Sequence, residues 1–121
     1  MIARIFVTGI PKNSNARSQW ARFAAARDRK TYRTRAAALG RTLVEDHGWE
    51  PAPFTTITAR HVSPVSRRRD PLGLAERLKG PSDGLVDAGA IPDDDEKHIQ
   101  IRLARSIRGI PAGIELTIVQ E

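Results

Sequence analysis

Residues 99–119 read IQIRLARSIRGIPAGIELTIV and contain two runs in which apolar and polar side chains alternate. The apolar positions are the odd-numbered residues of 99–103 and the even-numbered residues of 114–118. A period of two is the pattern of a β-strand with one buried face. Gly109 and Pro111 separate the runs, so the sequence predicts two neighbouring strands that pair as a hairpin.

Working outward from these strands, the sequence predicts two further strands with a helix between them. The predicted strands are Ile2–Thr8 and 54–62, both short and rich in β-branched residues. Between them, apolar residues recur at helical spacing over 31–47, and Gly48 is a typical helix stop. Residues 20–26 fit either an earlier turn of this helix or an ordered arm.

A second helix is predicted over 72–87, where leucines recur near helical spacing. Gly80-Pro81 lies in its middle and is expected to kink or split it, and Gly89 is expected to end it. The element order is then β-α-β-α-β-β. We therefore expect one α+β domain over residues 1–121, with a small mixed sheet and two main helices.

The composition excludes several kinds of site. The chain has 121 residues and no cysteine, which excludes disulfide bonds, zinc held by thiolates, iron–sulfur clusters and a thiol nucleophile. It has no apolar run near the ~18 residues that a membrane span needs, and its first residues lack the features of a signal peptide. We therefore expect a soluble, cytoplasmic protein whose metal ligands, if any, are oxygen or imidazole.

Positive charge is concentrated in the first third of the chain. The formal net charge is +6, from 20 Lys and Arg against 14 Asp and Glu, but residues 1–41 hold ten basic residues and only one acid, Asp28. One acid cannot neutralise most of these side chains through i,i+4 ion pairs. A solvated helix face is the ordinary explanation, but this imbalance favours a surface that binds phosphate groups.

Acidic residues gather in two loops that flank the second predicted helix. Asp70 directly follows three arginines, and residues 93–96 read DDDE. If the chain returns along the helix, both loops reach one pocket, where carboxylates suit Mg²⁺ and basic neighbours suit a phosphodiester. Of the histidines, only His98 is placed to approach such a metal. Ordinary alternatives stay open: Asp70 pairs with its arginines, and Asp93 is a turn or capping residue.

The stretch RRRDPLGLAERLKGPSDGLVDAGAIPDDDEKHI, residues 67–99, resembles the signature segment of the RusA family of Holliday junction resolvases. The family pattern is R-x-D-x-D-N-L, a helix with a lysine, D-x-L-x-x-A-G and a D-D pair. Residues 9–17, GIPKNSNAR, resemble the family's N-terminal P-x-S-x-N-x-x loop, and residues 31–43 resemble its following helix. The resemblance covers nearly the whole chain, and DGLVDAGAIPDDD is its most specific part.

The resemblance implies a RusA-like fold and a magnesium-dependent endodeoxyribonuclease that cuts four-way DNA junctions, with Mn²⁺ able to replace Mg²⁺. It implies that Asp70 and Asp94 ligate the metal and that Lys79 is catalytic, stabilising charge on the phosphate; a solvated helix lysine is the alternative. The family is often phage-encoded, which implies a bacterial host cytoplasm. Residues expected to hold DNA phosphates are Lys12, Asn15, Arg17, Arg67, Arg68 and Arg69. A homodimer is implied by the family and by the two-fold symmetry of a junction that needs paired nicks.

The chain departs from the family pattern at the second aspartate and the following asparagine, where it has Leu72 and Gly73. Leucine cannot bind a cation, so one metal ligand is missing. Glu76 is a candidate replacement, because a helix over 72–79 puts it one turn after Leu72 and beside Lys79; an ordinary surface ion pair explains Glu76 equally well. Two other hypotheses stay open: a catalytically impaired homologue that binds junction DNA, and a general RNA-binding α+β domain.

Overall fold

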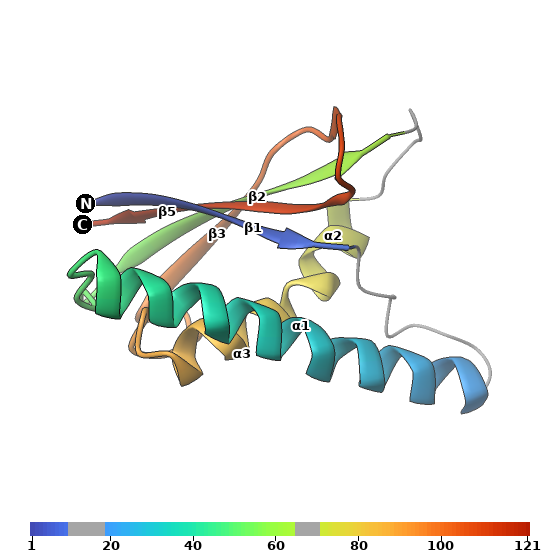
Figure 1. Ribbon diagram of the computed structural model, residues 1–121, viewed down its shortest axis with the longest axis horizontal. Helices are drawn as coiled ribbons and strands as arrows, with labels where there is room; N and C mark the ends of the chain where they lie inside the picture. The colour runs from blue at the N-terminus through green and yellow to red at the C-terminus, as the bar shows by residue number, and fades with distance from the viewer. Residues whose placement is uncertain (10–18, 65–70) are drawn as a thin grey trace.

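The chain folds into two layers, a β-sheet and a layer of helices against one of its faces (Figure 1). The computed structural model describes residues 1–9, 19–64 and 71–121. The elements are β1 (Ile2–Thr8), α1 (Gln19–Asp46), β2 (Thr55–Ser63), α2 (Pro71–Arg77), α3 (Lys79–Asp87), β3 (Ile99–Leu103), β4 (Ile107–Arg108) and β5 (Gly113–Gln120). This confirms the predicted mixed α+β class; the short β4 and the division of the second helix are additions to the predicted order.

The sheet is mixed, with the order β1-β5-β2-β3, and β4 pairs with β2. β5 is antiparallel to β1 and to β2, whereas β3 and β4 run parallel to β2. The predicted hairpin is therefore wrong, because β2 lies between β3 and β5. Alternation shows which face of a strand is buried but does not identify its neighbour. The two strands differ in the burial of their apolar side chains. β5 lies between two neighbouring strands and buries its apolar row, whereas β3 lies at the edge and exposes Ile101 and Leu103.

The register places an apolar row of each strand on the face that the helices cover. Ile57 of β2 pairs with Ile118 of β5, Ala59 pairs with Leu116, and all four are buried. Ile5 of β1 pairs with Leu116 and continues the row. The helices contribute Tyr32, Ala36, Leu74, Leu78 and Leu85 to the same buried cluster. The core therefore lies between the sheet and the helical layer.

A row of polar side chains crosses the opposite face of the sheet. Arg4, Thr117, Thr58 and Arg102 occupy paired positions on β1, β5, β2 and β3 and form one row across it. Successive side chains of a strand point to opposite faces, so this row points away from the buried apolar rows. Arg4 and Arg102 are exposed and lie on the side of the sheet that faces away from the helices.

α1 is one helix of 28 residues, longer than the predicted 31–47. The predicted part is confirmed, since Tyr32, Ala36 and Gly40 recur at helical spacing and are buried. Residues 20–26 also belong to α1, as their four alanines favour. The first half of α1 extends past the ends of β1 and α3 (Figure 1). None of the helices in the described ranges has the combination of length and apolar character that a bilayer span requires.

The second predicted helix is divided into α2 and α3 at Leu78. The expectation of a kink or split is confirmed, but the break precedes Gly80-Pro81. Pro81 lies in the first turn of α3, where its missing N–H costs no helical hydrogen bond. Gly89 follows the end of α3 with a φ of 75°, as the predicted helix stop requires.

α3 packs against α1 through two glycines that let the backbones approach. A Cβ atom at Gly84 would lie 2.2 Å from the carbonyl oxygen of Arg33 and 2.8 Å from the amide nitrogen of Ala37. A Cβ atom at Gly80 would lie 2.6 Å from the carbonyl oxygen of Arg29. Because these neighbours are backbone atoms, they cannot move aside as a flexible side chain would.

We expect Gly84→Ala to destabilise the protein by about 2–3 kcal/mol, because the new methyl group forces α3 away from α1. The sign of the change in unfolding free energy is the informative part, since Gly→Ala inside an unhindered helix stabilises a protein by about 1 kcal/mol. Ser82→Ala places alanine in the same helix at a half-buried position and serves as the control. Urea unfolding of the three proteins measures the difference, and a Gly84→Ala protein as stable as the parent would contradict the close packing.

Candidate active site

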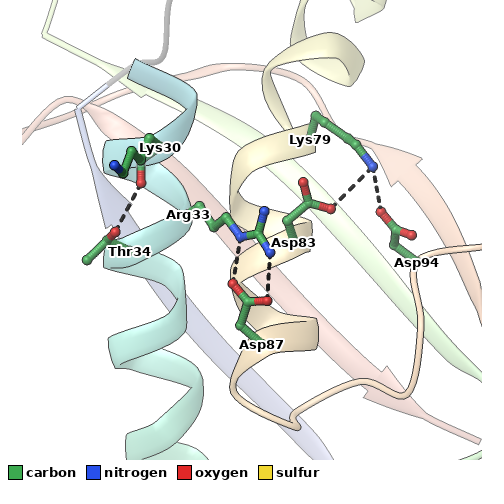
Figure 2. A network of polar contacts seen from close by, with 7 residues as sticks. All are labelled: Lys30, Arg33, Thr34, Lys79, Asp83, Asp87 and Asp94. Atoms are coloured by element: carbon green, nitrogen blue, oxygen red, sulfur yellow. Dashed lines mark hydrogen bonds and ion pairs between the residues drawn. The ribbon is translucent and has the colours of Figure 1, made fainter. Parts of the chain in front are cut away.

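Lys79, the first residue of α3, lies between two aspartates. Its Nζ atom is 3.0 Å from Oδ2 of Asp94 and 3.2 Å from Oδ1 of Asp83. Asp94 belongs to the loop between α3 and β3, whereas Asp83 lies one turn further along α3. Figure 2 shows both carboxylates directed at the same ammonium group. The fold thus joins two of the predicted catalytic residues, which are 15 positions apart in the sequence.

Lys79 and Asp94 line an open pocket of about 490 Å³. Its wall includes Glu76 of α2, Lys79, Asp94 and Arg29 of α1. Three of the predicted site residues therefore share one surface pocket. The continuous helix over 72–79, on which the prediction for Glu76 depended, is interrupted before Lys79. Glu76 and Lys79 consequently belong to two different helices and line the same pocket.

The other predicted site residues lie outside the part of the chain that the structure describes. They are Lys12, Asn15, Arg17, Arg67, Arg68, Arg69 and Asp70. Asp70 directly precedes Pro71, the first residue of α2. That Asp70 and Asp94 share a metal ion stays a prediction.

The contacts of Lys79 stabilise the charged forms of the groups that make them. Its hydrogen bonds to Asp94 and to Asp83 raise the pKa of the Lys79 ammonium above its ordinary value. The same hydrogen bond from Lys79 lowers the pKa of the Asp94 carboxyl. At neutral pH the site therefore holds an ammonium group beside an ionised carboxylate. Such a lysine acts as a fixed cation and not as a base.

The pocket offers the kind of ligand that Mg²⁺ prefers. Asp94 and Glu76, which both have carboxylates, line it, and Mg²⁺ in proteins commonly takes one or two carboxylates and keeps several water molecules. An open pocket leaves room for those waters and for a phosphodiester. The residues present therefore fit a magnesium ion.

A separate group of acidic side chains forms in the same loop. Ligand atoms of Asp93, Asp95 and His98 lie within 4.8 Å of one another, and Nδ1 of His98 contacts Oδ1 of Asp95. His98 thus lies with the two neighbours of Asp94, whereas the Asp94 carboxylate contacts Lys79. Exposed acidic groups commonly gather without an ion, so this cluster alone supports no assignment.

An ion pair between Arg33 and Asp87 joins α1 to α3 (Figure 2). Arg33 donates from Nε to Oδ2 of Asp87 at 2.6 Å and from Nη2 to Oδ1 at 2.8 Å. This two-bond geometry orients the guanidinium, and it lowers the pKa of the Asp87 carboxyl. Neither Asp83 nor the Arg33–Asp87 ion pair is among the predicted site residues. The i,i+4 spacing of Lys79 and Asp83 was the available signal for the first, whereas no local pattern links Arg33 to Asp87.

No protein-family model matches the chain, and a search of curated proteins finds no match. The functional assignment therefore depends on the residues themselves, on their arrangement, and on the motifs that resemble the RusA family.

Proposed function

We propose that the protein is a RusA-like, magnesium-dependent endodeoxyribonuclease that resolves four-way junctions and other branched DNA by hydrolysing phosphodiesters. The supporting observation is the contact of Lys79 with Asp94 at 3.0 Å in an open pocket. These are the residues that match the lysine and the D-D aspartate of the family motif. Their meeting is what a shared active site requires.

The roles follow from the chemistry of each side chain. Asp94, with Asp70 by resemblance, holds Mg²⁺ or Mn²⁺, and Glu76 offers a third carboxylate. A metal ion held there would supply Lewis-acid chemistry, polarising the phosphate and lowering the pKa of a bound water. Lys79 keeps a positive charge beside the scissile phosphate, where negative charge grows in the transition state. Asp83 holds Lys79 from the other side and so limits where its ammonium group can move.

The proposal also includes DNA-binding residues and a homodimer. The basic residues at 12, 17 and 67–69, with Asn15, would hold DNA phosphates, as the resemblance implies. Two nicks in opposite strands need two sites, so we propose a homodimer with two-fold symmetry. The proposed place of action is the cytoplasm, a bacterial one if the protein is phage-encoded.

A catalytically impaired junction-binding protein is the second candidate. It is favoured by Leu72 and Gly73, which replace a metal ligand and its neighbour in the family motif. This candidate predicts DNA binding with steep salt dependence and no cleavage product with any divalent metal.

The deciding experiment is incubation of the purified protein with a labelled synthetic four-way junction. We expect paired nicks with Mg²⁺ or Mn²⁺, no product with EDTA, and little cutting of a linear duplex of the same sequence. Binding without product would reject the nuclease and leave the impaired homologue.

The double variant Leu72→Asp with Gly73→Asn separates the remaining explanations. Strong gain of cutting indicates that the natural site lacks a ligand. An unchanged rate in an already active protein indicates that another carboxylate, Glu76 by position, replaces it. Preference for RNA loops over the junction in a competition gel would instead support the RNA-binding domain.

A further inference from the structure

A groove beside the candidate active site carries more positive than negative charge. It has a volume of about 540 Å³ and lies between α1 and α3. Its charged lining residues are Arg29, Lys30, Arg33, Arg41, Asp83 and Asp87. Four cations against two carboxylates leave an excess of positive charge in the groove.

The two carboxylates are already engaged by cations. Asp87 accepts two hydrogen bonds from Arg33, and Asp83 pairs with Lys79. In the described ranges, by contrast, Arg29 and Lys30 have exposed side chains with no ion-pair partner. These two cations are therefore available to an anionic ligand, and the engaged carboxylates repel such a ligand less than free ones would.

Arg29 connects this groove to the candidate active site. It lines the groove and also the pocket that holds Lys79 and Asp94. The close approach of Gly80 to the backbone of Arg29 fixes α1 beside the start of α3. A chain of phosphates leaving the pocket past Arg29 can therefore continue into the groove.

The four cations that line the groove form a basic row along α1, from Arg29 to Arg41. The length of this row indicates the size of the anion that fits it. Residues 29 to 41 of a helix span roughly 18 Å at 1.5 Å per residue. That is several times the size of one phosphate ion, and it equals about five nucleotide steps at 3.4 Å per step along one DNA strand. The row therefore matches a polymer of phosphates better than a single phosphate group.

We propose that the α1–α3 groove binds the phosphodiester backbone of the DNA strand next to the scissile phosphate, through Arg29 and Lys30. That the ligand is DNA rests on the proposed nuclease function, whereas the inference that it is an anionic polymer rests on the charge and length of the groove. Arg41 adds a further positive charge along α1. Arg29 and Lys30 lie outside the segments that resemble the RusA family.

The test compares two double variants that remove the same charge. Arg29→Gln with Lys30→Gln changes the groove, and Arg4→Gln with Arg102→Gln changes the polar face of the sheet away from the helices. Binding of each protein to a fluorescent four-way junction is followed by anisotropy at several salt concentrations in EDTA, which prevents hydrolysis. Thermal melting confirms that each variant is folded.

We expect the groove variant to bind about tenfold more weakly than the parent at low salt, and its plot of log affinity against log salt to be less steep by about 2, one for each lost phosphate contact. The sheet-face variant should keep the parental slope. Equal losses in the two variants would show a general charge effect and overturn the proposal. So would parental binding by the groove variant, or tighter binding of the parent to RNA than to the junction.

A single variant covers the case in which the double variant does not fold. Lys30→Glu reverses one exposed charge, and we expect it to weaken junction binding more than Lys97→Glu, which reverses an exposed charge in the acidic loop. The same binding by both would overturn the proposal. Cleavage is measured separately in Mg²⁺. If the parent protein binds the junction through the groove but makes no product, the proposed nuclease function is rejected and the proposed DNA-binding role of the groove is kept.

Discussion

Asp94→Asn is expected to abolish junction cleavage, with a fall of about 10³-fold or more, while binding to the junction in EDTA is retained. Asparagine has the size of aspartate but lacks its charge, so the ligand oxygen for Mg²⁺ weakens and the loop keeps its shape. The side chain is only 26% exposed and contacts Lys79. Its replacement therefore acts at the pocket and not on a general surface charge.

Asp95→Asn is the matched control, because it makes the same change one residue further along the same loop. Asp95 belongs to the separate group with Asp93 and His98, and we expect its variant to cut at near the parental rate. Single-turnover cleavage in Mg²⁺ measures both variants. Activity lost in Asp95→Asn and kept in Asp94→Asn would contradict the proposed site and move it to that group.

Lys79→Met is expected to slow cleavage by about 10²–10³-fold, the usual effect of removing one group that stabilises transition-state charge. Methionine keeps much of the length of the side chain but carries no ammonium. With Lys79 replaced, the pKa of Asp94 rises back towards its ordinary value, because the hydrogen bond that lowers it is absent. That value is still far below neutral pH, so Asp94 stays ionised and the loss reports on the lysine charge.

The matched control is Lys97→Met, which removes an exposed lysine from the neighbouring loop. Lys79→Arg retains the positive charge in a different shape and should recover part of the rate. Single-turnover rates at saturating protein separate this effect from DNA binding. A Lys79→Met protein that cuts within about threefold of the parent would exclude a catalytic role for the lysine.

Local patterns predicted the elements of the fold better than their arrangement. β1 has the predicted bounds, and the predicted second strand is displaced by one residue at each end. These segments carry their own signals in β-branched residues and turn residues. No local pattern predicts the pairing of β5 with β2, because the paired residues are about 60 positions apart in the sequence. The pairing depends instead on how the helices pack and on which strand then fits beside β2. The hairpin prediction failed at that step.

The candidate site was predictable where one helix connects its parts. Lys79 begins α3, and the loop after α3 returns Asp94 to the same end, so two residues near the ends of one connection could be expected to meet. Arg29 was not predictable as a neighbour of the pocket. Its place depends on the packing of α1 against Gly80, which no periodicity in either segment reveals.

The strand order also has a consequence for how the protein folds as it is synthesised. Among the strands in the described ranges, β1 is synthesised before the others, yet its one partner there is β5, which is synthesised after them, and β5 also separates β1 from β2. Until residues 113–120 have emerged, the nascent chain can form its helices and the parallel pair of β2 with β3, but β1 has no neighbouring strand. Sheet closure therefore waits for the final segment, and a topology built on such distant pairings is of the slow-folding kind.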